Sequence, residues 1–219
     1  LVGYMRRNVG SLEAGVKFLI LGALSTGFLV YGIAWIYGAT GTTDLALISD
    51  RITDQNSTYL LFGLALILIS LAFKVGAVPM HLWVPDVYQG APTPTTAFLS
   101  VASKASGFAI AIRVAEPFLN SGTELAGKTT FILAILAGAT ILFGNLAAIP
   151  QKNFKRLLAY SSIANAGFIL LPIAAWQTAT DELTSKQVVA FYLTIYLVMT
   201  FAAFFILAVI HRNTGSDEI

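Results

Sequence analysis

The chain has 219 residues, of which 57% are hydrophobic and only 11% are charged. A soluble domain carries roughly 45–50% apolar and about 25% charged residues, so this composition excludes an ordinary water-soluble domain. The absence of cysteine excludes disulfides, zinc–thiolate sites and iron–sulfur clusters. Two histidines cannot build a metal centre unaided. A net charge of +2 gives no support for a nucleic-acid partner.

The first residue is Leu1, and residues 2–7 read like the exit from an earlier apolar helix. We therefore expect the chain to be a fragment of a longer protein. A signal peptide is the alternative explanation for Arg6, Arg7 and the apolar run after them. That run, 18–38, exceeds a typical signal-peptide core, and five more runs follow it, which favours the fragment.

Predominantly apolar runs of 20 to 23 residues recur along the whole chain, and about 20 helical residues cross the ~30 Å hydrocarbon core of a bilayer. The six runs are 18–38, 58–78, 96–115, 129–149, 157–176 and 188–210. They predict an all-α fold, a polytopic transmembrane helix bundle in which residues 1–219 form a single membrane domain.

The loops between six spanning helices alternate between the two sides of the membrane, and their charges differ. One side receives seven basic residues: Arg6, Arg7, Lys17, Lys152, Lys155, Arg156 and Arg212. The other receives four basic residues among acidic ones: Arg51, Arg113, Lys128 and Lys186. Because excess positive charge marks the cytoplasmic face, both ends of the chain are predicted to be cytoplasmic.

The second run carries Lys74 shortly before Gly76 and Pro79. Proline removes an amide donor and clashes with the preceding turn, so the helix is expected to kink or break there. Broken helices at membrane depth survive when they are buried in protein or line a cavity, and transporters use them as ion sites. A simple interfacial loop over 79–95 is the alternative.

Lys104 lies near the middle of the third run, where an ammonium costs roughly 2.5–3.5 kcal/mol. Desolvation favours the neutral amine, so a lysine there can load and unload a proton, which an arginine cannot do. A structural lysine bonded to carbonyls is the alternative. His81, just after the break, is a candidate proton relay or a plain interfacial histidine beside Trp83.

Other polar residues have mainly structural interpretations. Asp86 and Tyr88 are expected to brace the segment after the break. Hydroxyl and amide groups at helical spacing in the last two runs predict hydrogen bonds between helices, with a water-wire lining as the alternative. These residues are Ser161 and Asn165, and Tyr192, Tyr196 and Thr200.

Residues 72–94 read AFKVGAVPMHLWVPDVYQGAPTP, and this string resembles the antiporter-like membrane subunits of the respiratory NADH:quinone oxidoreductase, complex I. Within that family the chain is most similar to subunit N of the bacterial enzyme, which corresponds to subunit 2 in mitochondria. SLEA at 11–14, GATG at 38–41 and KRLLAYSSIA at 155–164 look like the same subunit. The resemblance extends over essentially the whole chain.

The resemblance implies the middle of an inverted-repeat antiporter-like fold of about fourteen helices, with a broken helix at 58–78. Lys74 matches the family's lysine on that helix, and Lys104 matches the lysine on the next helix, on the central hydrophilic axis. The family's paired glutamate would lie before Leu1. Asn165 stands where many relatives have a histidine, which argues against a relay at that position.

The function implied is that of a proton-translocating membrane subunit, a part of a translocase without a redox centre of its own. NADH, flavin, iron–sulfur clusters and quinone would belong to partner subunits, and other membrane-arm subunits and the lipid of the cell inner membrane would surround the chain. Lys74 and Lys104 would carry protons, with His81 as a candidate relay. A sodium/proton antiporter subunit and a membrane scaffold without transport are the alternatives.

Overall fold

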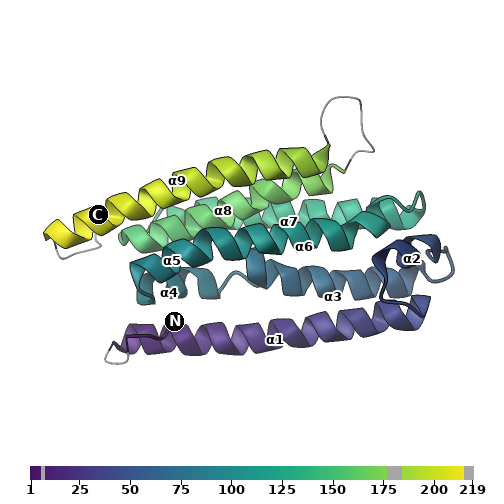
Figure 1. Ribbon diagram of the computed structural model, residues 1–219, viewed down its shortest axis with the longest axis horizontal. Helices are drawn as coiled ribbons and strands as arrows, with labels where there is room; N and C mark the ends of the chain where they lie inside the picture. The colour runs from purple at the N-terminus through teal and green to yellow at the C-terminus, as the bar shows by residue number, and fades with distance from the viewer. Residues whose placement is uncertain (6–7, 177–183, 215–219) are drawn as a thin grey trace.

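A computed structural model describes residues 1–5, 8–176 and 184–214, with the side chain of the last of these left out. Every regular element in the described part of the chain is helical (Figure 1). The elements are α1 (Val9–Thr40), α2 (Leu45–Asp50), α3 (Ser57–Val75), α4 (Trp83–Gly90), α5 (Thr93–Phe98), the π-helix η1 (Leu99–Ser103), α6 (Lys104–Leu119), α7 (Glu124–Ala148), α8 (Phe154–Ala174) and α9 (Ser185–Thr214). The predicted all-α class is confirmed.

Six helical segments in the described residues are long and apolar enough to cross a membrane, and each contains most of one predicted run. They are Val9–Thr40, Ser57–Val75, Thr93–Leu119, Glu124–Ala148, Phe154–Ala174 and Ser185–Asn213. The first begins well before the run at 18–38, because Glu13 and Lys17 continue the helix although they interrupt its apolar character. The chain is a multi-pass membrane protein.

The long helices lie roughly along one axis (Figure 1). Neighbouring helices approach closely at several glycine residues. A Cβ atom on Gly32 of α1 would lie 2.7 Å from the carbonyl oxygen of Gly63 on α3. A Cβ atom on Gly144 of α7 would lie 2.5 Å from the backbone nitrogen of Ala164 on α8. Such contacts allow helices to associate in lipid, where apolar burial drives association weakly.

The helix break is real, but it lies earlier than the proline indicates. The helix α3 ends at Val75, because Gly76 adopts a left-handed conformation with φ of 73°. The Ala77 amide then donates to the Ala72 carbonyl at 2.8 Å, which closes the helix end. The predicted run 58–78 therefore extends three residues too far, since a left-handed residue stops a helix before Pro79 can clash.

The segment after the break is also structured. Residues 83–90 form α4, which follows α3 along the long axis of the molecule (Figure 1), so the simple loop over 79–95 is wrong. The Trp83 indole donates to the Phe73 carbonyl at 3.0 Å, and the Val78 amide donates to the Thr140 hydroxyl of α7 at 3.1 Å. These bonds satisfy backbone groups that the break releases.

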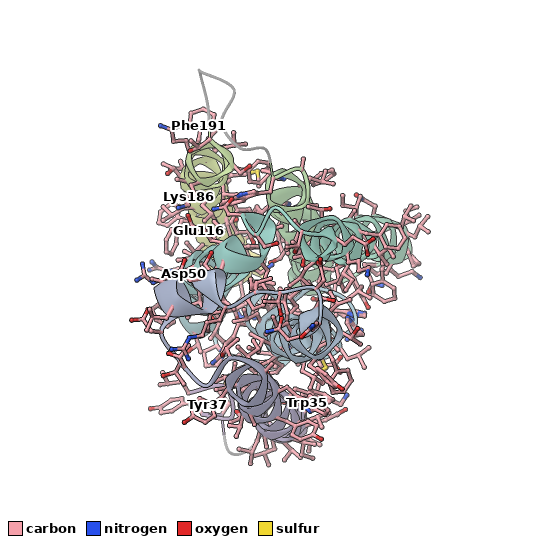
Figure 2. All side chains as sticks on the ribbon, turned by 90° about the vertical axis from the view of Figure 1, so that its right-hand side faces the viewer. Trp35, Tyr37, Asp50, Glu116, Lys186 and Phe191 are labelled. Carbon is pink, nitrogen blue, oxygen red and sulfur yellow. The ribbon has the colours of Figure 1, made fainter. Side chains whose placement is uncertain are left out.

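The two ends of the bundle carry different groups. The N-terminus, α4, α5 and the C-terminal part of α9 lie at one end, as six crossings predict, and α2 lies at the other (Figure 1). Figure 2 looks onto the α2 end, where Glu116 of α6 and Lys186 of α9 lie side by side. Their ion pair measures 2.5 Å between Nζ and Oε1 and ties two spanning helices together.

Candidate functional site

Lys104 occupies the centre of a membrane-crossing segment. It follows η1 directly, so one widened π turn joins α5 to α6 and sets the rotation at which the lysine emerges. Its side chain is fully enclosed, with only 2% of the residue exposed. An enclosed ammonium at this depth requires polar partners.

The partners of Lys104 come from three other helices. Its Nζ atom donates a hydrogen bond to the backbone carbonyl of Ser162 in α8, and it lies 5.8 Å from the ring centroid of Tyr196 in α9. A Cβ atom on Gly76 would lie 3.8 Å from the same Nζ, so the ammonium faces the carboxyl end of α3. That end carries the negative pole of the helix dipole, which favours a cation.

Ser162 also joins two tyrosines. Its hydroxyl lies 3.0 Å from the Tyr88 hydroxyl of α4 and 2.8 Å from the Tyr196 hydroxyl of α9. Sequence reasoning missed Ser162 and treated Tyr88 only as a brace, because no spacing rule connects residues 74 positions apart. The neighbouring bond from Tyr192 to Asn165, at 2.7 Å, confirms the predicted hydrogen bonding between the last two spanning helices.

Lys74 has a different environment. It is exposed on the surface of the described chain, and it forms no hydrogen bond or ion pair with any residue that the structure describes. Its Cβ atom lies 3.2 Å from the position that a Cβ atom on Gly107 would occupy, so its backbone packs against α6. The two lysines therefore belong to one contact between α3 and α6, but their side chains have separate surroundings.

His81 lies between α3 and α4 and is 6% exposed. Its ring packs edge-on against Phe143 of α7, with 4.1 Å between ring centroids. Neither ring nitrogen has a hydrogen-bond partner among the described residues. A buried unpaired polar group is costly and is normally satisfied by water or by another chain segment. The structure does not link His81 to Lys74 or Lys104.

A charged cluster closes the end of the bundle that carries α4. Asp86 of α4 accepts from Lys17 of α1 at 2.6 Å and from Arg156 of α8 at 2.9 Å. Lys17 also pairs with Glu13 at 2.6 Å. Burial raises the pKa of the Asp86 carboxyl, but hydrogen bonds from the two cations outweigh this effect and hold the pKa below its usual value. Asp86 braces its segment as expected, through partners that the sequence did not indicate.

The described residues contain no group of three histidine, aspartate or glutamate side chains that could hold a metal ion. The polar groups that the described residues gather around Lys104 are a backbone carbonyl and the hydroxyl groups of Ser162, Tyr88 and Tyr196. The central feature of the site is the enclosed side chain of Lys104.

The known proteins that this chain resembles are membrane subunits. The family described as NADH:quinone oxidoreductase/Mrp antiporter, transmembrane, matches residues 1–219. The chain is 46% identical over 226 residues to NADH-quinone oxidoreductase subunit N of Chlorobium chlorochromatii (strain CaD3), and the alignment covers 100% of this chain and 43% of the relative.

Two solved structures have the same fold. A chain of the membrane-bound sulfane sulfur reductase, an archaeal respiratory membrane complex, matches with a TM-score of 0.86 and 30% identity over 100% of this chain and 43% of that chain. A chain of respiratory complex I from Thermus thermophilus matches with a TM-score of 0.73 and 38% identity over 91% of this chain and 41% of that chain. The chain thus spans less than half the length of these relatives.

Proposed function

Because the chain belongs to the NADH:quinone oxidoreductase/Mrp antiporter transmembrane family, we propose that it is part of a proton-translocating membrane subunit of an NADH:quinone oxidoreductase. The proposed role is to couple electron transfer in other subunits to proton movement across the bilayer. Residues 1–219 would form one membrane domain within that subunit. The similarity to subunit N of Chlorobium chlorochromatii supports this proposal.

The observation that carries the proposal is the enclosed Lys104. A lysine that is 2% exposed at the centre of a membrane-crossing segment is expensive to keep unless its charge has a use. When protonated, it donates to the Ser162 carbonyl and faces the negative end of α3. When neutral, it no longer needs either partner, so protonation changes how strongly the lysine is held.

Lys74 is the second proposed proton carrier. Its exposed side chain and its lack of a described partner are consistent with a carboxylate that approaches from outside residues 1–219. We assign this role to a glutamate on a helix before Leu1. A carboxylate favours the charged amine, and its withdrawal favours the neutral one. His81, which is enclosed with two unpaired nitrogens, is the candidate relay near the break.

The redox chemistry would belong to partner subunits that hold NADH, flavin, iron–sulfur clusters and quinone. Sister antiporter-like subunits would lie beside this one in the membrane arm. The likeness to chains of two multisubunit respiratory complexes supports these partners. The protein would lie in the cell inner membrane, with the end that carries Lys17, Asp86 and Arg156 facing the cytoplasm, as the basic excess on that side indicates.

The test uses the full-length subunit in its assembled complex, in inverted membrane vesicles driven by NADH. Lys104→Ala should abolish acidification of the vesicle interior, which is measured by the quenching of an acridine dye. The subunit content of the membrane should stay unchanged. Lys104→Arg should fail as well, because a permanent cation cannot release a proton. The matched control is Lys128→Ala, which removes an exposed lysine paired with Glu124 and should pump normally. If Lys104→Arg pumped at the parental rate, the lysine would act only as a fixed positive charge and not as a proton carrier.

A sodium/proton antiporter subunit is the second candidate, because the matching family includes Mrp antiporters. The two candidates differ in what drives them. Vesicles that acidify on addition of NADH, independently of sodium, support the oxidoreductase subunit. A proton flux that requires a sodium gradient and persists without NADH supports the antiporter.

A further inference from the structure

Three buried hydroxyl groups from three helices meet beside Lys104. Tyr88 of α4 is 1% exposed, Ser162 of α8 is 3% exposed, and Tyr196 of α9 is 3% exposed. The Ser162 hydroxyl lies in the middle and bonds to both tyrosines, at 3.0 Å and 2.8 Å. We call these three residues the hydroxyl bridge.

The hydroxyl bridge has a strict hydrogen-bond requirement. Each hydroxyl carries one proton, so Ser162 can donate to only one tyrosine and must accept from at least one. Removing either tyrosine hydroxyl breaks one contact in a region closed to water. A buried polar group that loses its partner destabilises the arrangement that depended on it.

The same serine holds the ammonium of Lys104. The backbone carbonyl of Ser162 accepts a hydrogen bond from Nζ. Because a carbonyl oxygen has two lone pairs, it can accept this bond and a helical backbone bond at the same time. Tyr196 touches both parts of the arrangement. Its hydroxyl bonds to Ser162, and its ring lies 5.8 Å from Nζ, within the range of a cation–π interaction.

The neighbouring tyrosine on α9 provides an internal comparison. Tyr192 lies one helical turn before Tyr196, and its hydroxyl also bonds to a polar residue of α8, Asn165, at 2.7 Å. Hydrogen bonding between α8 and α9 therefore does not depend on Ser162 alone. Of these two bonds between α8 and α9, only that of Tyr196 leads to Ser162, the residue that holds Lys104.

We propose that Tyr196 and Tyr88, acting through the hydroxyl of Ser162, are positioning residues for Lys104. The bridge fixes the Ser162 carbonyl and the Tyr196 ring where the protonated amine needs them. It thereby connects the charge on α6 to α4, the second half of the broken helix, and to α9. This inference rests on the proposed function of Lys104 as a proton carrier.

The test compares hydroxyl deletions in the full-length subunit within its complex, in the same NADH-driven vesicles. Tyr196→Phe keeps the ring and removes the hydroxyl, and Ser162→Ala keeps the carbonyl and removes the hydroxyl. Each should lower the pumping rate about fivefold at unchanged subunit content, since a hydrogen bond contributes a factor of about 2 to 13. Ser162→Thr, which restores a hydroxyl, should recover most of the rate, and Tyr88→Phe should act like Tyr196→Phe.

Tyr192→Phe is the matched control and should pump at the parental rate. The double variant Tyr196→Phe/Ser162→Ala should cost no more than Ser162→Ala alone, because Ser162→Ala already removes the bond that Tyr196→Phe removes. Two results would overturn the inference and make the bridge a structural element. One is a loss of pumping rate with Tyr192→Phe equal to that with Tyr196→Phe. The other is a fall in pumping that only follows a fall in subunit content.

Lys104→Ala is measured alongside to separate the two proposals. If Lys104→Ala abolishes pumping while Tyr196→Phe and Ser162→Ala pump at the parental rate, the positioning role is overturned and the proposed function stands. If Lys104→Ala itself pumps normally, both fall together.

Discussion

Lys104 and Lys74 interrupt the apolar segments within one helix contact, yet the fold surrounds them differently. Lys104 is enclosed and has a carbonyl, an aromatic ring and a helix end around its ammonium. Lys74 is exposed and has no hydrogen-bond or ion-pair partner among the described residues. The difference indicates that residues 1–219 complete the surroundings of one lysine and leave those of the other open.

The largest expected effect comes from Gly76, because it shapes the helix end that both lysines share. Gly76→Ala places a Cβ atom at φ of 73° and 2.9 Å from Cγ2 of Val84, so left-handed strain of roughly 1–2 kcal/mol adds to a clash. The amount of assembled subunit and its melting temperature should both fall sharply. These are measured by immunoblotting of membranes and by thermal unfolding of the purified complex.

Gly27→Ala is the control for that substitution. Gly27 lies inside α1, and beyond its chain neighbours and the adjacent backbone of that helix no described atom lies within 4 Å of the Cβ that alanine would add. Stability should stay the same or rise slightly, because alanine is a better helix former. A Gly76→Ala complex with the parental melting temperature would show that the left-handed residue is not what forms the break.

The second effect concerns the missing partner of Lys74. In the full-length subunit, Lys74→Ala and removal of the glutamate proposed on the helix before Leu1 should each cripple proton pumping. The double variant should cost little more than either single change, because residues that act as a pair are not additive. The same cycle with Lys104→Ala in place of Lys74→Ala should show weaker coupling. Additive losses for Lys74 would mean that it has another partner.

A smaller effect is expected at Asp86, which joins α1, α4 and α8 at one end of the bundle. Asp86→Asn removes two partly exposed ion pairs, with Lys17 and with Arg156, and should lower the free energy of unfolding by about 1–2 kcal/mol at pH 7. Because the pKa of Asp86 is lowered in the fold, its contribution is present above its unfolded pKa and is lost as the pH falls through the lower folded value. The difference between variant and parent should therefore begin to shrink near the unfolded pKa, at about pH 4, and should vanish once the pH lies below the lower folded pKa.

Thermal unfolding of the purified complex at several pH values measures that difference. Glu124→Gln is the control, since its ion pair with Lys128 is largely exposed and should contribute little. If the difference in stability between Asp86→Asn and the parent stayed constant down to pH 3, the carboxylate charge would not be what stabilises this cluster.

The smallest effect is a labelling pattern without functional loss. The chain has no cysteine, so Gln151→Cys and Asp54→Cys can be labelled singly without background. We expect an impermeant reagent to reach Asp54→Cys from the periplasmic side and Gln151→Cys from the cytoplasmic side only. Labelling of Gln151→Cys from the periplasm would show that the orientation is the reverse of the proposed one.

The main features of the fold could be predicted from the sequence because membrane helices follow local rules. A run of about 20 apolar residues predicts a spanning helix whatever surrounds it. Gly76 and Pro79 likewise indicate the break after Lys74. In the structure the helix ends at Val75, because Gly76, which precedes Pro79 in the chain, adopts a left-handed conformation. The early start of α1 was missed, since apolar runs do not reveal helical residues beyond the hydrocarbon core.

The candidate site was predictable only in part. Lys104 was found because a charge inside an apolar run is conspicuous on its own. Its partner Ser162 lies 58 residues away, and Asp86 lies 69 and 70 residues from Lys17 and Arg156. Serines and tyrosines are common in such helices, and no local pattern distinguishes those that meet from those that do not.

The sequence by itself determined that six segments are long and apolar enough to cross a membrane, that one helix breaks shortly after Lys74, and that Lys74 and Lys104 lie within apolar runs. These properties depend on the free energy of placing each short segment in lipid, and that free energy is set mainly by residues adjacent in the sequence. Only the tertiary structure decided that Lys104 is enclosed beside Ser162 and Tyr196 while Lys74 stays exposed. The reason is that enclosure depends on which helices pack together, and a buried ammonium is tolerated only where distant segments supply its partners.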